Sequence, residues 1–121
     1  MESEQPDLKI DERGMLYEAF RLGDSQVFVI TLEPNSVRGN HFHRRKIEKF
    51  IAVAGSCEIV SRNRDTEEVT RLQVNGSEPQ IVTVSPDNTH KITTADKPCT
   101  LICWVSEIFD IGDTDTVAED V

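Results

Sequence analysis

The segment RGNHFHRRKIEKF, residues 38–50, places two histidines one residue apart and a glutamate five residues after the second histidine. It also holds five Lys and Arg residues, although the whole chain has a formal charge of −9. Side chains alternate between the two faces of a β-strand, so His41 and His43 would point the same way if they lie on one. Three alternatives follow: a metal site, a binding site for an anion, or the basic end of an ordinary hairpin.

The rest of the chain predicts an all-β fold. Short segments rich in Val, Ile, Thr and Phe alternate with turn sequences such as LGDS, NRDT and SPDN about every 8 to 12 residues. The expected strands are residues 15–20, 26–33, 49–55, 56–63, 67–74, 79–85 and 99–105. No segment before residue 106 keeps a helical apolar period. This pattern is typical of a sandwich or barrel, and segments that are apolar on both faces, such as VFVITL, indicate a closed barrel or a dimer.

A chain of 121 residues is long enough for one domain with a core and too short for two. We expect residues 1–7 to be disordered, residues 8–112 to form the barrel, and residues 113–121 to be an acidic C-terminal tail. Ile108, Phe109 and Ile111 are too apolar for a solvated tail, so we expect them to pack on the barrel.

The net charge argues against a nucleic acid or a membrane surface as partner, because phosphate groups would repel the chain. The first ten residues lack the features of a secretory signal, and no apolar segment is long enough to cross a bilayer, so we expect a cytoplasmic protein. Cys57, Cys99 and Cys103 are odd in number and lack C-x-x-C spacing, which favours buried thiols over disulfides or zinc ligands.

His41, His43, Glu48 and His90 are the candidate metal ligands, and they include every histidine in the chain. Glu48 would face away from His43 in a straight strand, so the metal site requires a turn near residues 44–46, which we expect to place Glu48 on the neighbouring strand facing the same interior. His90 follows the turn SPDNT. Three imidazoles and one carboxylate suit Zn, Fe, Mn, Ni or Cu rather than Ca or Mg. The alternative is a polar barrel mouth, with His90 bonded to the backbone of its turn.

The spacing of these residues resembles the two motifs of the cupin superfamily. The first motif, H-x-H-x(3,4)-E-x(6)-G, fits residues 41–55, and P-x-G-x-x-H is partly fitted by residues 86–90. The glycine of the second motif and the asparagine that usually follows its histidine are missing. The resemblance implies a single-domain cupin jelly roll, a double-stranded β-helix barrel. It also implies one divalent transition metal per chain, with zinc expected ahead of iron, manganese or nickel.

The segment 38–50 is also similar to R-G-N-H-Y-H-x-x-K-x-E-K-F in the C-terminal cupin domain of capsular polysaccharide enzymes that act on UDP-4-keto-hexoses. SEIFDIGDTDT, residues 106–116, resembles the ending of that domain, and with DERGMLYEAF, residues 11–20, the similarity covers residues 10 to 116. In that family this domain epimerises carbon 3 of the sugar, and a separate N-terminal domain reduces carbon 4. This sequence has no Gly-rich nucleotide fingerprint. The resemblance implies a homodimer with a nucleotide-sugar substrate, paired with a reductase on a separate chain.

A more distant similarity joins the chain to the deoxysugar 3,5-epimerases, through D-x-R-G-x-(F/L)-x-E at residues 11–18 and R-G-x-H at residues 38–41. In that family the histidine at the position of His41 is a catalytic base. A metal-bound imidazole has no free lone pair for that task. Because His43 and Glu48 are both present at cupin spacing, we favour metal ligation for His41.

These features together predict a metal-dependent epimerase or isomerase that acts on a nucleotide-linked 4-keto-hexose in cell-surface polysaccharide or deoxysugar biosynthesis. Lys46 and Tyr17 are the preferred acid/base residues, and Lys49 and Glu18 are further candidates. Arg38 and Lys49 are expected to bind substrate, since guanidinium groups suit a diphosphate. Arg44 and Arg45 are expected in a solvated turn.

The sequence is compatible with two other functions. One is a non-catalytic cupin dimer that binds a metal or a small ligand, in keeping with the altered turn before His90. The other is a cupin dioxygenase with the same ligand set, which the sugar-family segments do not support.

Overall fold

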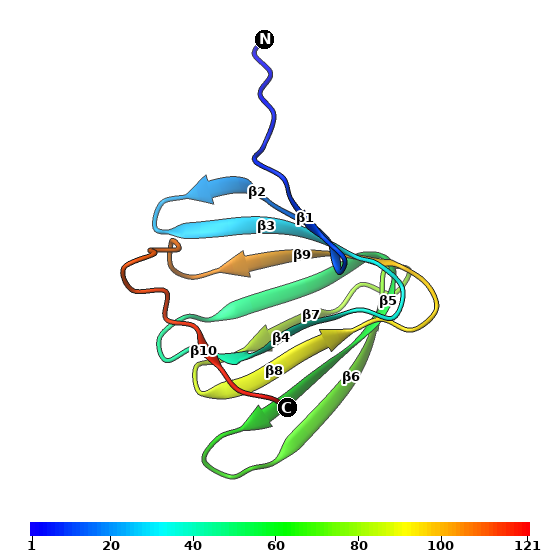
Figure 1. Ribbon diagram of the computed structural model, residues 1–121, viewed down its shortest axis with the longest axis vertical. Coiled ribbons are helices and arrows are strands. Elements are labelled where there is room, and N and C mark those ends of the chain that lie inside the picture. The colour runs from blue at the N-terminus through cyan, green and yellow to red at the C-terminus, as the bar shows by residue number, and fades with distance from the viewer.

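The structure, a computed structural model that describes residues 1–121, consists of ten β-strands without a helix (Figure 1). No helix is therefore available to span a membrane. The strands are β1 (Lys9–Asp11), β2 (Gly14–Leu22), β3 (Ser25–Leu32), β4 (Val37–Phe42), β5 (Glu48–Asn63), β6 (Val69–Asn75), β7 (Ile81–Val84), β8 (Asn88–Thr93), β9 (Cys99–Val105) and β10 (Val117–Ala118). The predicted all-β class is confirmed.

The strands form one curled antiparallel sheet in the order β1-β2-β3-β9-β5-β8-β4-β10, with β6 and β7 attached to β5 (Figure 1). Strict alternation decides which side chains face the inside of the curl. In β9, Cys99, Leu101, Cys103 and Val105 are buried, whereas Ile102 lies on the outer face. The core is the inner face of the curl, and the cysteines in it are free thiols, as the sequence predicts.

Strand β5 is one continuous strand of 16 residues, so the prediction of two separate strands at 49–55 and 56–63 is wrong. Its first half pairs with β7 and β9, and its second half pairs with β6 and β8. Gly55 bends the strand, with φ of 72° and a close approach to the backbone of Pro98 that leaves no room for a Cβ atom. The glycine therefore lets one strand serve both sides of the curl.

The predicted turn between the two parts of the first motif is present after β4, at residues 44–45. It does not form a hairpin, however. β4 pairs with β8 and β10, while β5 begins among β7 and β9. Our expectation that Glu48 lies on the strand next to His43 is therefore wrong: the turn crosses the open curl, and the two residues face each other from opposite sides.

The C-terminal segment lies on the barrel, because β10 pairs with β4. Its contacts differ from those expected. Ile111 is 89% exposed, so its predicted packing is wrong, whereas Phe109, although 51% exposed, lines the cavity with its ring 5.5 Å from the Lys46 ammonium. The buried residue of the segment is Asp115. Arg45 is also not simply solvated, since its guanidinium lies 3.2 Å from carboxylate oxygens of both Glu107 and Asp113.

Two valines of β6 provide a test of which face forms the core. Val74 is 2% exposed and belongs to the core cluster, whereas Val69 is 48% exposed. Val74→Ala should lower the free energy of unfolding by about 2 kcal/mol through lost burial and a residual cavity. Val69→Ala should change it by less than about 0.5 kcal/mol. Urea denaturation followed by circular dichroism measures both values, and equal losses would contradict the assignment of the inner face.

Candidate metal centre

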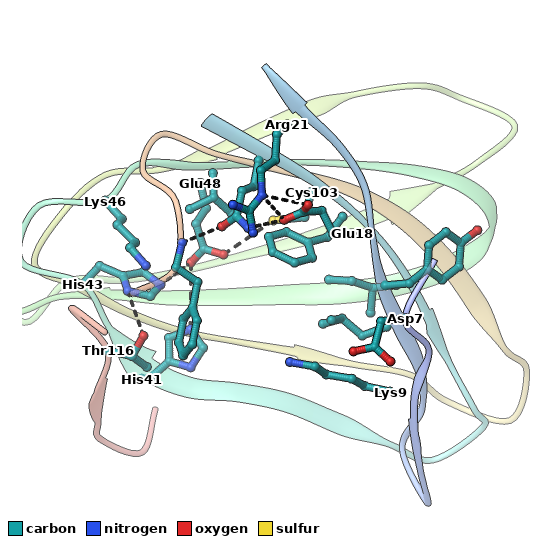
Figure 2. A pocket seen from close by; sticks show the side chains of 17 residues that line it. Asp7, Lys9, Glu18, Arg21, His41, His43, Lys46, Glu48, Cys103 and Thr116 are labelled. Carbon is teal, nitrogen blue, oxygen red and sulfur yellow. Dashed lines mark hydrogen bonds and ion pairs between the residues drawn. The ribbon is translucent and has the colours of Figure 1, made fainter. Parts of the chain in front are cut away.

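The structure brings together all four candidate metal ligands, and Figure 2 shows three of them, His41, His43 and Glu48. His41 lies on β4, His43 follows the end of that strand, Glu48 is the first residue of β5, and His90 lies on β8. The centroid of the His41 ring is 4.9 Å from that of His43 and 4.8 Å from that of His90. One ligand atom from each of the four residues lies within 4.8 Å of all the others.

One carboxylate oxygen, Oε1 of Glu48, lies at the centre of the three imidazoles. It is 2.7 Å from Nε2 of His43, 2.9 Å from Nε2 of His90 and 3.9 Å from Nε2 of His41. Ligands about 2.0–2.1 Å from a tetrahedral zinc ion are separated from one another by about 3.3 Å. The observed distances bracket this value, so a small shift of the carboxylate accommodates an ion, and the residues present fit a transition metal.

Hydrogen bonds on the far side of two rings direct their Nε2 atoms to the centre. Nδ1–H of His43 donates to the carbonyl of Asp115 at 2.7 Å, and Nδ1–H of His90 donates to the carbonyl of Asn88 at 3.0 Å. Such outer partners fix the tautomer and orientation of metal-binding histidines. The carbonyl of Asn88 thus supports His90 in a chain that lacks the usual asparagine after that histidine.

The turn before His90 forms without the glycine of the second cupin motif. Asp87 adopts φ of 59°, in the left-handed region that Asp and Asn tolerate better than other non-glycine residues. Its N–H donates to the carbonyl of His43 at 2.7 Å, and the Asn88 side chain donates to the carbonyls of Ser85 and Pro86. The altered turn therefore holds both motifs together.

The charges of the cluster keep Glu48 ionised. Burial alone raises the pKa of Glu48, but the three imidazoles around it, of which His43 is hydrogen-bonded to Oε1, more than offset this and hold the pKa well below its usual range. Burial lowers the pKa of His43, yet the bond to Glu48 and its charge, with the Asp115 carbonyl, bring it above its ordinary value. A metal ion must bind the unprotonated Nε2 of His43, so the raised pKa of this imidazole makes metal binding weaker at lower pH.

The second oxygen of the Glu48 carboxylate accepts a hydrogen bond from Cys103. Its thiol donates to Oε2 at 3.5 Å, and burial, together with the nearby carboxylate, raises the thiol pKa well above the usual range. The sulfur therefore stays protonated. It leaves Oε1 as the oxygen that meets the three imidazoles.

His41, His43 and Glu48 line a cavity of about 460 Å³, within the usual range for small-molecule sites, while His90 lies buried behind them. Its apolar wall includes Leu16, Phe28, Ile30 and Val105 from the inner face of the curl. Polar side chains line the rest, namely Asp7, Lys9, Glu18, Arg21, Gln26, Lys46 and Thr116. Figure 2 shows Asp7 and Lys9 from the N-terminal segment on the side of the cavity away from His43.

Lys46 is placed in this cavity, beside His43 (Figure 2). The residue is 4% exposed, its ammonium lies 5.5 Å from the ring centroid of Phe109, and no carboxylate lies within ion-pair distance of it. Its positive charge acts against the protonation of His43. The structure therefore brings this predicted acid/base residue to the metal centre.

The two predicted substrate-binding residues, Arg38 and Lys49, do not line the cavity. Lys49 lies on the outer face, where its ammonium donates to Thr83 Oγ1 at 3.0 Å, so it does not line the cavity. Arg38 faces inward opposite Ile92 but lies outside the cavity lining, and burial lowers its pKa.

Tyr17 borders the cavity, yet its position on β2 argues against a role as acid or base. It pairs with Val29, whereas its neighbours Leu16 and Glu18 pair with Ile30 and Phe28 of the inner-face set. Its phenol is therefore directed to the outer face. Glu18 holds the inward position, where its carboxylate accepts hydrogen bonds from Gln26 and Arg21.

Sequence reasoning missed Gln26, Cys103 and Asp115 as parts of the site. Gln26 is 3% exposed and joins Glu18 to the C-terminal segment, because its Oε1 accepts the N–H of Phe109 at 2.7 Å. For Asp115 a signal was present, since it lies in the segment that resembles the ending of the capsular enzymes. The residue's role still depends on contacts that the sequence does not contain.

Comparison with known proteins identifies the family. Residues 9–117 match the polysaccharide biosynthesis C-terminal domain, a match that covers nearly the whole chain. The chain belongs to this family. A UDP-2-acetamido-2,6-beta-L-arabino-hexul-4-ose reductase of Pseudomonas aeruginosa is 34% identical over 110 residues, which are 89% of this chain and 30% of that protein.

Solved structures agree with this family and establish the fold. The capsular polysaccharide assembling protein CapF from Staphylococcus aureus superposes with a TM-score of 0.93 at 32% identity, over 98% of this chain and 34% of that chain. Oxalate decarboxylase from Lactobacillus farciminis superposes with a TM-score of 0.78 at 19% identity, over 93% of this chain and 33% of that one. The predicted cupin jelly roll is confirmed, and the chain spans about a third of the length of these relatives.

Removal of the central carboxylate should abolish tight metal binding. Glu48→Gln removes the negative ligand, so the affinity for Zn²⁺ should fall by more than the ~10–100-fold that loss of an outer partner costs. The matched control is Glu58→Gln on the same strand, whose carboxylate pairs with Arg71 away from the centre. Competition with a chromogenic chelator measures both affinities. Equal affinities for the two variants would contradict the assignment of Glu48.

Proposed function

We propose that this protein is a metal-dependent cupin that epimerises or isomerises a nucleotide-linked 4-keto-hexose in the biosynthesis of cell-surface polysaccharide or deoxysugars. The observation that carries the proposal is the cluster of three histidines and Glu48, open to a cavity that also holds a buried lysine. The name of the Pseudomonas relative describes a UDP-linked 4-keto sugar, and the family belongs to polysaccharide biosynthesis.

The chemistry begins with loss of a proton from a carbon beside the ketone. A divalent transition metal at the cluster, with zinc the first expectation, supplies a Lewis acid that stabilises the negative charge developing on the ketone oxygen. The three imidazoles and Glu48 would hold the metal ion, and His41, His43 and Glu48 line the inner end of the cavity where the ketone would bind. The apolar wall of Leu16, Phe28 and Ile30 limits water around the sugar ring.

The proposal needs an acid and a base on different sides of the sugar carbon. Lys46 serves as one of them, because it is buried in the cavity without a carboxylate partner. Glu18 replaces Tyr17 as the candidate for the other, since Glu18 points inward from β2 while Lys46 approaches from the turn before β5. One group takes the proton from carbon and the other returns a proton to the opposite face, which inverts the centre.

Lys9 is the proposed contact for the diphosphate of the substrate. It lines the cavity on the side away from His43 and makes no ion pair in the structure (Figure 2). A nucleotide sugar with its ketone at the metal centre would extend toward this end. Lys9 thus takes the role that the sequence assigned to Arg38 and Lys49.

We also propose that the protein acts in the cytoplasm and that a reductase, on a different domain or chain, reduces its product. The three cysteines are free, as is usual in a reducing compartment. Residues 1–121 contain no Gly-rich nucleotide fingerprint, so the reduction named for the relative requires another polypeptide segment.

We also propose a homodimer that uses the outer face of the sheet. The register aligns Tyr17, Val29, Ile102, Ile51 and Ile81 in one row across five strands. The next row adds Phe20, which is 64% exposed, with Val27 and Trp104. An apolar surface of this extent is typical of an interface between subunits.

Exchange of substrate hydrogens with solvent tests the reaction. The zinc-loaded protein should incorporate deuterium from D₂O at carbon 3 or carbon 5 of the UDP-4-keto sugar named for the Pseudomonas relative. Lys46→Met should slow this exchange by roughly 10²-fold or more, as expected for loss of a proton-transfer group. Lys49→Met is the matched control and should retain the wild-type rate, because Lys49 lies on the outer face. NMR and mass spectrometry measure the exchange.

Two results would overturn the enzymatic proposal. The first is binding of the UDP-4-keto sugar without exchange above the buffer rate, which a non-catalytic cupin would give. The second is an equal rate for Lys46→Met and wild type. Apo protein prepared with a chelator should show the buffer rate, which separates metal dependence from exchange by the protein alone.

The oligomeric state tests the proposed interface. Wild-type protein should sediment as a dimer at micromolar concentration, and Ile102→Glu should sediment as a monomer because the charge would be buried in the apolar row. Val69→Glu, on β6 outside the two rows, should remain dimeric. Monomeric wild-type protein in analytical ultracentrifugation, or a dimeric Ile102→Glu variant, would contradict the interface.

A further inference from the structure

We propose that Asp115 is a positioning residue of the metal centre, through which the C-terminal segment holds the histidine pair and the turn to Glu48 in place. This inference rests on the proposed metal centre but not on its reaction. Asp115 is 7% exposed as a residue, and its side chain is 1% exposed. Neither its carboxylate nor its carbonyl touches the cavity, so it acts through other residues.

The carboxylate of Asp115 organises the turn between the two parts of the first motif. One oxygen accepts the backbone N–H of Arg44 at 3.1 Å, and the other accepts those of Arg45 and Lys46, each at 2.9 Å. Three successive N–H groups directed at one anion form a concave anion site of the type that turns build. The turn crosses the open curl, so its backbone N–H groups are not paired with a strand. The carboxylate of Asp115 accepts them instead and so holds the turn in one conformation.

The carbonyl of the same residue orients a ligand ring. Nδ1–H of His43 donates to it at 2.7 Å, which leaves Nε2 of that ring for the centre. Asp115 adopts φ of 54°, in the left-handed region that is uncommon for a residue with a side chain. A single residue in this conformation thus binds the turn with its carboxylate and the His43 ring with its carbonyl.

The strand that follows fixes Asp115 to the other histidine of the pair. In β10, Val117 pairs with Phe42 and Ala118 pairs with His41. The segment 115–118 therefore contacts His41 through the sheet, His43 through its ring, and residues 44–46 through the turn. These contacts all fall on residues 41–46, which include two candidate ligands and precede the third, Glu48.

The ion pair with Arg45 does not account for these contacts. The Arg45 guanidinium is 47% exposed, lies 3.6 Å from Asp115, and also lies 3.2 Å from Asp113. Exposed pairs of this kind contribute little. Burial raises the pKa of Asp115, but the N–H groups of Lys46, Arg45 and Arg44 lower it more, so the carboxylate remains ionised at neutral pH.

The test compares Asp115→Asn with Asp113→Asn. Both remove one charge from the same segment and from the same arginine side chain, but Asp113 accepts no backbone N–H of the turn and makes no hydrogen bond to His43. In Asp115→Asn the amide NH₂ replaces one carboxylate oxygen and cannot accept a hydrogen bond from the backbone N–H that it faces. The affinity for Zn²⁺, measured by chelator competition, should fall ~10–100-fold in Asp115→Asn. It should stay within about twofold of wild type in Asp113→Asn, since that residue lies outside the organised turn.

A second readout separates positioning from general stability. In wild-type protein, ¹⁵N NMR should place a proton on Nδ1 of His43, and Zn²⁺ should slow amide exchange at residues 44–46. These measurements need no variant, so they decide the question even if Asp115→Asn does not fold. A lowered melting temperature with unchanged Zn²⁺ affinity would overturn the proposal, as would unchanged exchange at residues 44–46 on metal binding.

The outcomes keep this inference apart from the proposed function. Wild-type protein that binds no Zn²⁺ would overturn both the metal centre and the positioning role. Tight Zn²⁺ binding that depends on Asp115, without hydrogen exchange in the keto sugar, would support the positioning role and overturn the epimerase proposal.

Discussion

The buried charge of Glu48 is the constraint on which the rest of the structure depends. A carboxylate that is 8% exposed at the end of a partly apolar cavity is costly unless donors or a cation surround it. Its partners come from β4, from the residue after β4 and from β8, while Glu48 itself begins β5. The curl of the sheet, the bend of β5 at Gly55 and the turn that crosses the curl all serve to bring these groups to one point.

The alternation of the strands separates an inner face, which lines the cavity, from an apolar outer face. Lys46 and Lys49 are three residues apart, yet the first lies in the cavity and the second bonds Thr83 outside. Tyr17 and Glu18 are adjacent, yet the first joins an apolar outer row and the second points to the cavity. In β2 the pleat turns the consecutive side chains of Tyr17 and Glu18 to opposite sides, whereas Lys46 lies outside the strand, in the turn that precedes β5.

The C-terminal segment links the site to the family. The match to the polysaccharide biosynthesis C-terminal domain ends at residue 117, so it includes Asp115 and the first residue of β10. Gln26 connects the same segment to Glu18 through the N–H of Phe109. The candidate metal ligands, the cavity wall and the segment that follows β9 therefore form one connected unit, and this unit matches about a third of the length of the relatives.

The sequence by itself predicted the all-β fold, most strand positions and the four residues that meet at the centre. Their spacing is local within residues 41–48, and His90 follows a recognisable turn. It could not predict that 49–55 and 56–63 form one strand, because a bent strand and a tight turn both use glycine. Only the tertiary structure decided which way Tyr17, Arg38 and Lys49 face, since that depends on register. It alone brought Asp115 to His43 across 72 residues of chain, because the contact arises when β10 pairs with β4.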